Sequence, residues 1–464
     1  MKRKDFFKAS SLAFLGTALT PSLSSNSPAA KRTFRTAKNI IFLVSDGMSN
    51  GTLSMADLLM QRKFGRRSTW LTLYEEQLAS RALMDTASAN SFVTDSAAAS
   101  SSWGGGVRVN NGALNVNPDG SENTPVLQKF KKAGKSVGCV TTVPITHATP
   151  AGFCVTSKKR DDQEAIALKY LSLRFDLMMG GGLEYFSKEK RSDKQDVLKL
   201  FTDSGFAVVR DKKSMLEIND NRPVLGVFHE GGLPFALDAA NQPGKSNVPT
   251  LAEMTRTAIS ILSANKKGFV MQVEGGKVDW AAHANDCGAL LYDQLAFDEA
   301  VKIAFDFAEK DKETLVIITT DHGNANPGLF YGGKANDNFD AIIKHRFTNE
   351  WILNGVGSQT SAGLLRDRVM DAQGWLLKDE EARELLAYYT NLSNDGLYNP
   401  HHLPFKRFAQ LQEKHTSVGW GSMDHSGDYV ELAMYGPGSE LLKPFIKNYQ
   451  LHHLMLEAAA IKYR

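Results

Sequence analysis

Four short motifs in this chain combine carboxylates with serine or histidine at the ends of apolar runs. They are Ser45-Asp46-Gly47, Thr94-Asp95-Ser96-Ala97, Asp279-Trp280-Ala281-Ala282-His283 and Thr320-Asp321-His322. Carboxylate oxygens and imidazole nitrogens bind divalent ions, and a serine beside such ions is a potential nucleophile. Together the motifs predict two metal ions beside a serine, and hence metal-assisted transfer of a phosphoryl group through that serine.

Ser96 is the candidate nucleophile. It follows Asp95 and precedes three alanines, which favour the start of a helix. Serine and aspartate commonly cap helix N-termini, so capping is the alternative role for this pair. The two roles are compatible, because the positive end of the helix dipole and an adjacent cation would both favour the serine alkoxide.

The candidate metal ligands are spaced so that neighbouring pairs can face one ion. Asp279 and His283 stand four residues apart, as required on one face of a helix. Asp321 and His322 are adjacent, so both reach one ion only at a turn that follows a strand. His425 precedes the last apolar run. With the aspartate of the first motif these residues form a cysteine-free set that suits zinc or a similar divalent ion.

Apolar runs typical of strands alternate with helical stretches, which predicts an α/β fold with a large, mostly parallel central sheet and helices on both faces. The strand-like runs are Asn39–Val44, Val137–Val143, Asp176–Met179, Val224–Phe228, Phe269–Val273, Leu315–Thr319 and Val430–Tyr435. The helical stretches are Val126–Ala133, Asp162–Leu173, Leu251–Ala264 and Leu290–Glu309.

Polar residues follow four of these runs. Asp46, Glu274 and Asp321 each close one run, and residues 142–149 follow another. Ligands of open α/β sheets bind outside the carboxyl ends of the strands. We therefore expect these residues to converge although they are far apart in sequence.

The stretch at about 327–420 breaks the alternation. It contains glycine-rich loops, a helical stretch at Ser361–Tyr389 and residues such as His401, His402 and Trp420, without a strong strand. We interpret it as a lid or cap inserted between two strands of the sheet. A surface excursion without a role is the alternative.

Composition narrows the class of protein. A chain of 464 residues that is 42% hydrophobic can bury a large core. The first ten residues carry the whole formal charge of +3, so the remainder lacks the basic excess that favours nucleic acid or anionic lipid. Cys139, Cys154 and Cys287 are odd in number and scattered, so we interpret them as structural.

The N-terminus has the pattern of an export signal. Basic residues precede the apolar stretch at 11–19, and a Pro/Ser/Asn region follows it to Ala30. This pattern predicts a signal peptide over residues 1–30 that is too short to span a bilayer, and hence a periplasmic or secreted protein. Arg3-Lys4 resembles a twin-arginine signal with one lysine, and an ordinary Sec signal is the alternative.

The motifs together resemble the secreted alkaline phosphatases, which are metal-dependent and use a serine nucleophile. The resemblance extends from about Asn39 to Thr320 and resumes from about Met423 to Gly438. It implies an alkaline phosphatase-like catalytic domain over residues 31–464 that hydrolyses phosphate monoesters through a phosphoserine. It also implies two zinc ions and one magnesium ion per chain.

The resemblance assigns roles to particular residues. It implies Ser96 as the phosphorylated residue, Arg160 as the phosphate clamp and Asp95 as the group that orients Arg160. The implied ligands are Asp279, His283 and His425 for one zinc, Asp46, Asp321 and His322 for the second, and Asp46, Thr149 and Glu274 for magnesium, with His147 bound to it directly or through water.

Two features depart from the family pattern. Gly323-Asn324 follows Asp321-His322 where the family has an acidic residue, which puts the wall of the pocket in doubt. His147 and Trp280 replace charged residues that some members have near the third metal, so the identity of that metal is less secure.

Two other functions are compatible with the residues. A phosphodiesterase or phosphonate hydrolase of the same superfamily would use similar ligands, and a metal-dependent phosphate-binding protein would not turn over. Arg160 and the magnesium residues favour small phosphate monoesters, which carry more negative charge than diesters. We expect no nucleic acid partner and no stable membrane span, and a homodimer is compatible with the resemblance.

Overall fold

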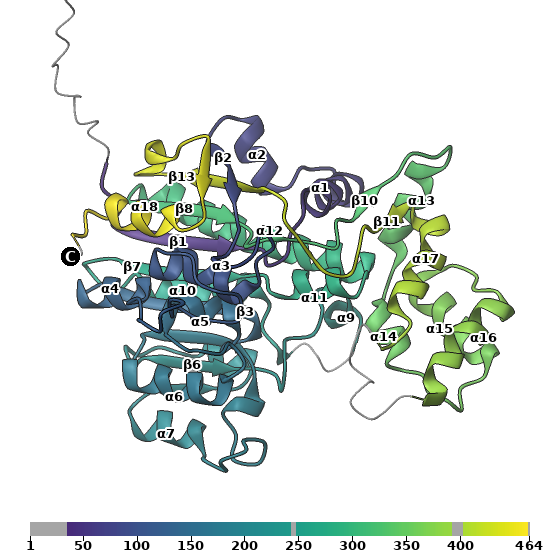
Figure 1. Ribbon diagram of the computed structural model, residues 1–464, viewed down its shortest axis with the longest axis horizontal. Helices are drawn as coiled ribbons and strands as arrows, with labels where there is room; N and C mark the ends of the chain where they lie inside the picture. Colours follow the sequence, from purple (N-terminus) through teal and green to yellow (C-terminus); the bar gives the residue numbers. More distant parts are fainter. Residues whose placement is uncertain (1–34, 243–246, 392–401, 463–464) are drawn as a thin grey trace, which may run out of the picture. The chain divides into compact units, whose positions relative to one another are not determined.

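The computed structural model describes residues 35–242, 247–391 and 402–462. Its main feature is a ten-stranded sheet (Figure 1). From one edge to the other, the strands are β14 (Phe445–Lys447), β2 (Ser80–Asp85), β13 (Val430–Tyr435), β8 (Thr314–Thr319), β1 (Asn39–Val44), β7 (Phe269–Glu274), β3 (Ser136–Pro144), β4 (Leu177–Gly181), β6 (Val224–Val227) and β5 (Ala207–Val209). Only β13 runs antiparallel to its neighbours, so the predicted mostly parallel sheet is confirmed.

Helices cover both faces of the sheet, as predicted. β1 is buried along its whole length, and its alternate residues enter two different cores: Phe42 faces one and Leu43 the other. The first core takes residues from α3 (Ser96–Gly105), α4 (Val126–Lys132), α5 (Ala148–Cys154), α6 (Gln163–Leu173), α7 (Val197–Asp203) and α18 (Gln450–Ala458). The second takes residues from α1 (Asn50–Phe64), α2 (Thr69–Glu75), α8 (Lys212–Leu216), α10 (Leu251–Leu262), α11 (Lys277–His283) and α12 (Cys287–Asp311).

The strands at the two margins of the sheet were not predicted from the sequence. β14 and β5 have only three residues each, and β2 carries a charged residue at one of its two exposed positions. These short or interrupted runs lack the continuous apolar pattern of the central strands, which are buried on both faces.

The three cysteines, Cys139, Cys154 and Cys287, are all buried and free.

The segment between β8 and β13 contains a separate group of helices, which we call the insert (residues 327–420). It contains α13 (Ala335–Ala341), α14 (Asn349–Leu353), α15 (Ala362–Gln373), α16 (Asp379–Ala387) and α17 (Phe405–Thr416), and these helices group together beside the sheet (Figure 1). Residues of α14 to α17 share a core that also takes in Ala284 and Met423 from outside the insert. At the base of the insert β10 (Gly328–Leu329) pairs with β11 (Val418–Gly419).

One expectation about the insert was wrong. The predicted helical stretch Ser361–Tyr389 is two helices, because Gly374 adopts a left-handed φ of 75° and ends α15. His401 and the predicted signal peptide lie outside the described residues. Among the described helices, none has both the length and the apolar character needed to cross a membrane.

The aromatic contact beneath β1 gives a test of this packing. The Phe42 ring centroid lies 5.1 Å from that of Trp103 and 5.0 Å from that of Phe153. We expect Phe42→Ala to lower the free energy of unfolding by about 3–5 kcal/mol, because the cavity would lie between a strand and two helices. Phe64→Ala, whose side chain is 55% exposed, should change it by less than about 0.5 kcal/mol. Urea denaturation measures both, and similar losses in the two variants would contradict the packing.

Candidate active site

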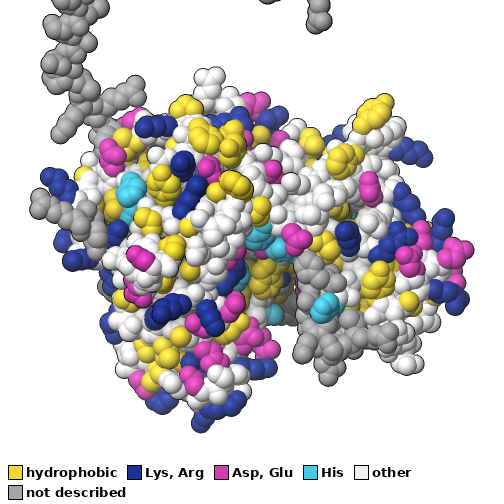
Figure 2. Space-filling model, viewed as in Figure 1, with side chains coloured by type: hydrophobic (Ala, Val, Ile, Leu, Met, Phe, Trp, Pro, Cys, Tyr) yellow, Lys and Arg dark blue, Asp and Glu magenta, His cyan; other side chains and the backbone are white. Residues whose placement is uncertain are grey.

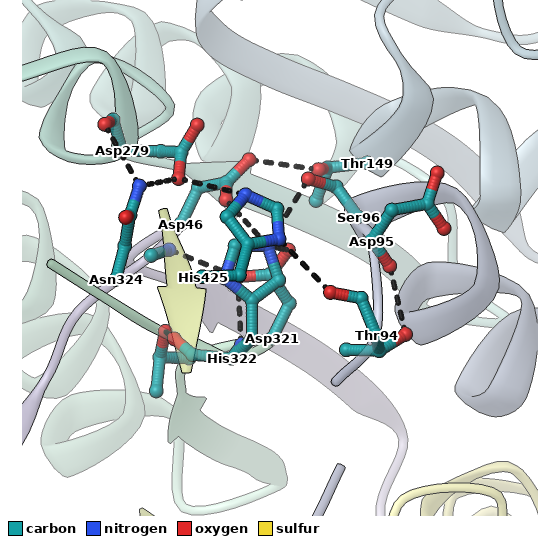
Figure 3. Close-up of polar contacts among 12 residues, drawn as sticks. Asp46, Thr94, Asp95, Ser96, Thr149, Asp279, Asp321, His322, Asn324 and His425 are labelled. Atoms are coloured by element: carbon teal, nitrogen blue, oxygen red, sulfur yellow. Dashed lines mark hydrogen bonds and ion pairs between the residues drawn. The ribbon is translucent and has the colours of Figure 1, made fainter. Parts of the chain in front are cut away.

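The carboxyl ends of four adjacent strands bring the predicted residues together. β8, β1, β7 and β3 are neighbours in the sheet and run parallel. Asp321 follows β8, Asp46 follows β1, Glu274 ends β7, and Thr149 lies in α5 just after β3. The convergence expected from the sequence is therefore present in the structure, and most of these side chains point toward one another in Figure 3.

The first group of ligand atoms contains Asp46, Asp321 and His322, all fully buried. The Nε2 atom of His322 lies 3.1 Å from Asp321 Oδ2 and 3.6 Å from Asp46 Oδ1. His322 Nδ1 lies 3.2 Å from the carbonyl oxygen of Gly323. The hydroxyl of Ser96 is 3.3 Å from the same Nε2 atom, so the candidate nucleophile adjoins this group.

The second group contains Asp279 and His283 of α11 and His425 of β12 (His425–Ser426). Each imidazole has its Nδ1 atom on a backbone carbonyl: His283 lies 2.6 Å from Met423 O, and His425 lies 2.9 Å from Thr94 O. A carbonyl only accepts, so each Nδ1 carries the proton and each Nε2 has a free lone pair.

Those two Nε2 atoms lie 3.1 Å from each other. Two lone pairs at that distance repel unless a cation or a proton lies between them. The Asp279 carboxylate completes the group, with its oxygens 3.5 Å from His283 Nε2 and 3.6 Å from His425 Nε2. The donor set of one carboxylate and two oriented imidazoles is typical of zinc sites.

The third group contains Asp46, Glu274 and His147. Thr149 donates its hydroxyl to Asp46 over 3.0 Å, and Thr141 donates to Glu274 over 2.5 Å. Thr141 was not identified from the sequence, since a threonine inside a buried strand has no distinguishing spacing. Clustered carboxylate and hydroxyl oxygens suit a hard ion such as magnesium.

His147 has a different contact in this structure. Its Nε2 atom lies 3.1 Å from a terminal nitrogen of Arg160. A guanidinium only donates, so Nε2 accepts here and Nδ1 carries the proton. Burial, followed by the charge of Arg160, lowers the pKa of His147 to about 3. His147 is therefore a neutral partner of Arg160 in this arrangement.

Asp95 and Arg160 lie on the nucleophile side of the site. Asp95 caps α3 by accepting the Ala98 amide over 2.9 Å, and its other oxygen accepts from Arg160 over 3.1 Å. Ser96 is thus the first residue of α3, where the helix dipole is positive. Lys158 and Lys159, which directly precede Arg160, are exposed.

Buried charge dominates the electrostatics. Burial, and then the charges of Asp321 and Asp279, raise the pKa of Asp46 well above its ordinary value. Burial also raises the pKa of Glu274 to about 7. For Asp279 and Asp321 burial acts in the same direction, but the neighbouring imidazoles outweigh it and lower the pKa of both carboxyls.

The residues present fit the bound cations that the sequence predicts. One oxygen each of Asp46, Asp321 and Glu274 is buried without a hydrogen-bond partner. Unpartnered buried carboxylate oxygens are costly, and a divalent ion satisfies several of them at once. The three groups share the ligand chemistry that such ions require.

Two further residues shape the second group and were not assigned a role from the sequence. Asn324 of β9 (Gly323–Asn324) donates to Asp279 Oδ1 over 2.7 Å, so the departure after His322 supplies a donor that orients this carboxylate. Gly47 has a left-handed φ of 67°, and a Cβ atom there would lie 2.4 Å from Asp279 Oδ1. An aspartate-glycine pair after a strand indicates only a turn, so the role of Gly47 could not be predicted from the sequence. The contact of Asn324 with Asp279 joins residues far apart in the chain, so it could not be predicted either.

Comparison with known proteins decides the family. The pattern of the family described as alkaline phosphatase matches residues 37–461. The chain belongs to the alkaline phosphatase family. Alkaline phosphatase 4 of Bacillus subtilis (strain 168) is 30% identical over 417 residues, which cover 89% of this chain and 86% of that protein. The alkaline phosphatase of Escherichia coli (strain K12) is 31% identical over 377 residues, 70% of this chain and 80% of that protein.

Solved structures agree with this assignment. The crystal structure of Thermus thermophilus alkaline phosphatase matches with a TM-score of 0.84 and 30% identity, over 96% of this chain and 97% of that one. The predicted family and fold are confirmed, and so is the predicted activity: this alkaline phosphatase is an enzyme that hydrolyses phosphate monoesters. Its family is metal-dependent, and the candidate ligand groups are in place.

The raised pKa of Glu274 predicts a pH dependence in the metal-free protein. Between the ordinary value of 4.5 and about 7, folded Glu274 holds a proton that the unfolded chain releases. The stability of chelated wild type relative to chelated Glu274→Gln should therefore fall as pH rises through this window, by on the order of 3 kcal/mol. Urea denaturation at pH 5 and pH 8 measures the difference. A difference in stability between the two proteins that is the same at pH 5 and pH 8 would contradict the raised pKa of Glu274. With metal present the trend should reverse, since ions bind the carboxylate form.

Proposed function

We propose that this alkaline phosphatase acts through a phosphoserine at Ser96, in a site that holds two zinc ions and one magnesium ion. The observation that carries the proposal is the position of the Ser96 hydroxyl, 3.3 Å from His322 Nε2 and beside buried carboxylates with unpartnered oxygens. A serine hydroxyl needs such an environment, because it is a weak nucleophile at its free pKa.

Each candidate group would hold one ion. Two oriented imidazoles and a carboxylate favour zinc in the group of Asp279, His283 and His425, and the imidazole of the Asp46, Asp321 and His322 group favours zinc there too. Oxygen ligands from Asp46, Thr149 and Glu274 favour magnesium in the third group, with His147 nearby. When bound, the ions would lower the pKa of the serine hydroxyl and offset the charge on the attacking and leaving oxygens.

The chain's own residues would bind and orient the phosphoryl group. Arg160 presents a planar fork that can donate to two phosphoryl oxygens, which a lysine cannot do. Asp95 fixes one edge of that fork through the 3.1 Å contact, and His147 accepts from the other terminal nitrogen. Ser96 would attack phosphorus from the N-terminus of α3, where the helix dipole favours the incoming negative charge.

The alternatives from the sequence receive less support. The substrate of a diesterase or phosphonate hydrolase carries less negative charge than a monoester. Arg160 and an ion in the third group would both supply positive charge, which suits a monoester better. Turnover of a mono-aryl phosphate against a bis-aryl phosphate would distinguish them. A binding protein without turnover has no need for a serine in the position of Ser96, and the family is one of enzymes.

The physiological setting is also part of the proposal. Residues 1–30 have the pattern of a Sec or Tat-like signal, which supports export and scavenging of phosphate outside the cytoplasm. Small phosphate monoesters would be the substrates, and the insert would act as a lid or cap over them. In Figure 2 histidine side chains reach the surface in the hollow between the insert and the rest of the molecule, which contains the sheet.

Ser96→Ala tests the nucleophile. We expect turnover to fall by at least about 10³-fold, as when other covalent nucleophiles are removed, with metal content and fold unchanged. Ser102→Ala is the matched control, because this buried hydroxyl of the same helix bonds only the Ala98 carbonyl. Acid trapping with a labelled monoester should mark Ser96 alone. Label on another residue, or full activity in the Ser96 variant, would refute the assignment.

Arg160→Ala should weaken recognition of phosphate without abolishing hydrolysis. A hydrogen bond to a charged group contributes about 1.5–3 kcal/mol, which corresponds to a loss in kcat/KM of roughly 10- to 150-fold. Arg160→Lys keeps the charge but loses the planar fork, so its kcat/KM should lie between those of wild type and Arg160→Ala. Inhibition by inorganic phosphate should weaken in the same order, and unchanged inhibition in the alanine variant would show that another residue clamps phosphate.

A further inference from the structure

The turn that follows α11 contacts the insert at the start of α14 and also contacts the chain just after the insert. In the segment after the insert, Ser422 accepts at its carbonyl from the side-chain amide of Asn285 over 2.8 Å. The next carbonyl, that of Met423, accepts from Nδ1 of His283. Asn285 also has a left-handed φ of 47°, so the backbone reverses at this point. The last residue of α11 and the turn after it therefore hold the chain where it leaves the insert.

Asp286 holds the start of α14, a helix of the insert, from the same turn. Its side chain is fully buried, and Oδ1 caps α12 by accepting the Ala289 amide over 3.0 Å. Oδ2 accepts the amides of Asn349 over 2.6 Å and Glu350 over 3.3 Å, at the start of α14. One carboxylate thus joins the N-termini of two helices: α12, which packs on the sheet, and α14, which belongs to the insert.

Asn349 passes this contact into the interior of the insert. Its side-chain oxygen accepts from Gln373 over 2.8 Å and from Gln412 over 3.0 Å. Gln412 also donates to Gln373 over 2.6 Å. These three buried amides connect α14, α15 and α17, so a shift of α14 would be carried by the insert as a unit.

We propose that Asp286 and Asn285 are positioning residues that couple the insert to the metal group of Asp279, His283 and His425. The proposal rests on the proposed function in so far as that group holds an ion. His283 is oriented by a carbonyl that follows the insert, and the turn beside it holds both α14 of the insert and the Ser422 carbonyl after the insert. Firm placement of the insert therefore keeps His283 in the orientation that presents Nε2 to the ion.

The coupling acts in both directions. If the placement of the insert strengthens metal binding, metal binding must stabilise the placement of the insert by the same factor. The amides of Asn349 and Glu350 lie at the joint, so their exchange with solvent reports the state of the insert. The release of metal reports the state of His283. Both are measurable without turnover.

Asp286→Asn is the test variant. An amide has one acceptor atom, so whichever way it turns, the start of α12 or of α14 faces a donor. Asp298→Asn is the matched control, since Asp298 is also a buried residue of α12 and accepts two amides, Thr69 over 2.8 Å and Trp70 over 3.1 Å, away from the insert. We expect zinc to pass to a chelating dye at least about 10-fold faster from the test variant, and at the wild-type rate from the control.

Asn285→Gly is a second variant that preserves the turn, because glycine accepts a left-handed φ without strain. It removes the side-chain contacts with the Ser422 and Ala282 carbonyls, and it should also release zinc faster than wild type. Equal rates in wild type and in both test variants, or an equal rise in the Asp298 control, would overturn the coupling.

Hydrogen exchange on chelated protein separates this inference from the proposed function. Asp286→Asn should speed exchange at residues 349–350 and also at 422–425, in the segment just after the insert. Faster exchange confined to 349–350 would show that the two segments are independent, and would overturn the proposal. A protein that holds no zinc or hydrolyses no monoester would refute the proposed function and leave this comparison intact.

Discussion

The repulsion among four buried carboxylates is the constraint on which the rest of this structure depends. Asp46, Glu274 and Asp321 are fully buried, and Asp279 is 5% exposed. An uncompensated buried charge costs several kcal/mol even after the protein relaxes. The pKa of Asp46 is raised and those of Asp279 and Asp321 are lowered, so the cluster divides between carboxyls that resist ionisation and carboxylates that need a cation.

The sheet is what allows so much charge to be gathered. The carboxylates lie at or just after the ends of β1, β7 and β8, or in α11, which follows β7, so each is held by the packing of the element beside it. Parallel neighbours β8, β1, β7 and β3 place these ends side by side, and buried runs on both faces keep them rigid. Backbone carbonyls from distant segments then fix the imidazoles, which turn their Nε2 atoms toward the carboxylates.

The sequence was sufficient to predict the parts that depend on local pattern. Continuous apolar runs identified the central strands, with β1 and β13 at their observed bounds, and a polar residue after each run identified Asp46, Glu274 and Asp321. The helix start at Ser96 followed from its capping aspartate. These features have short-range causes, so one sequence reveals them.

The remaining features depend on partners that are distant in the chain. Asn324 orients Asp279, and Thr141 donates to Glu274. Asp286 joins two helices whose first turns are about sixty residues apart in the chain. No local pattern specifies such contacts, because they arise only when the elements are packed.

Anomalous X-ray diffraction on crystals grown without chelator, with data collected on both sides of the zinc absorption edge, would show which ions the carboxylate cluster holds. We expect zinc peaks about 2.0–2.3 Å from the ligand atoms of the Asp279 and Asp321 groups. We also expect a lighter, six-coordinate ion about 2.1 Å from the oxygens of Asp46 and Glu274. Well-ordered carboxylates that bond to one another through protons, with no ion among them after zinc and magnesium are supplied, would contradict the proposed metal site.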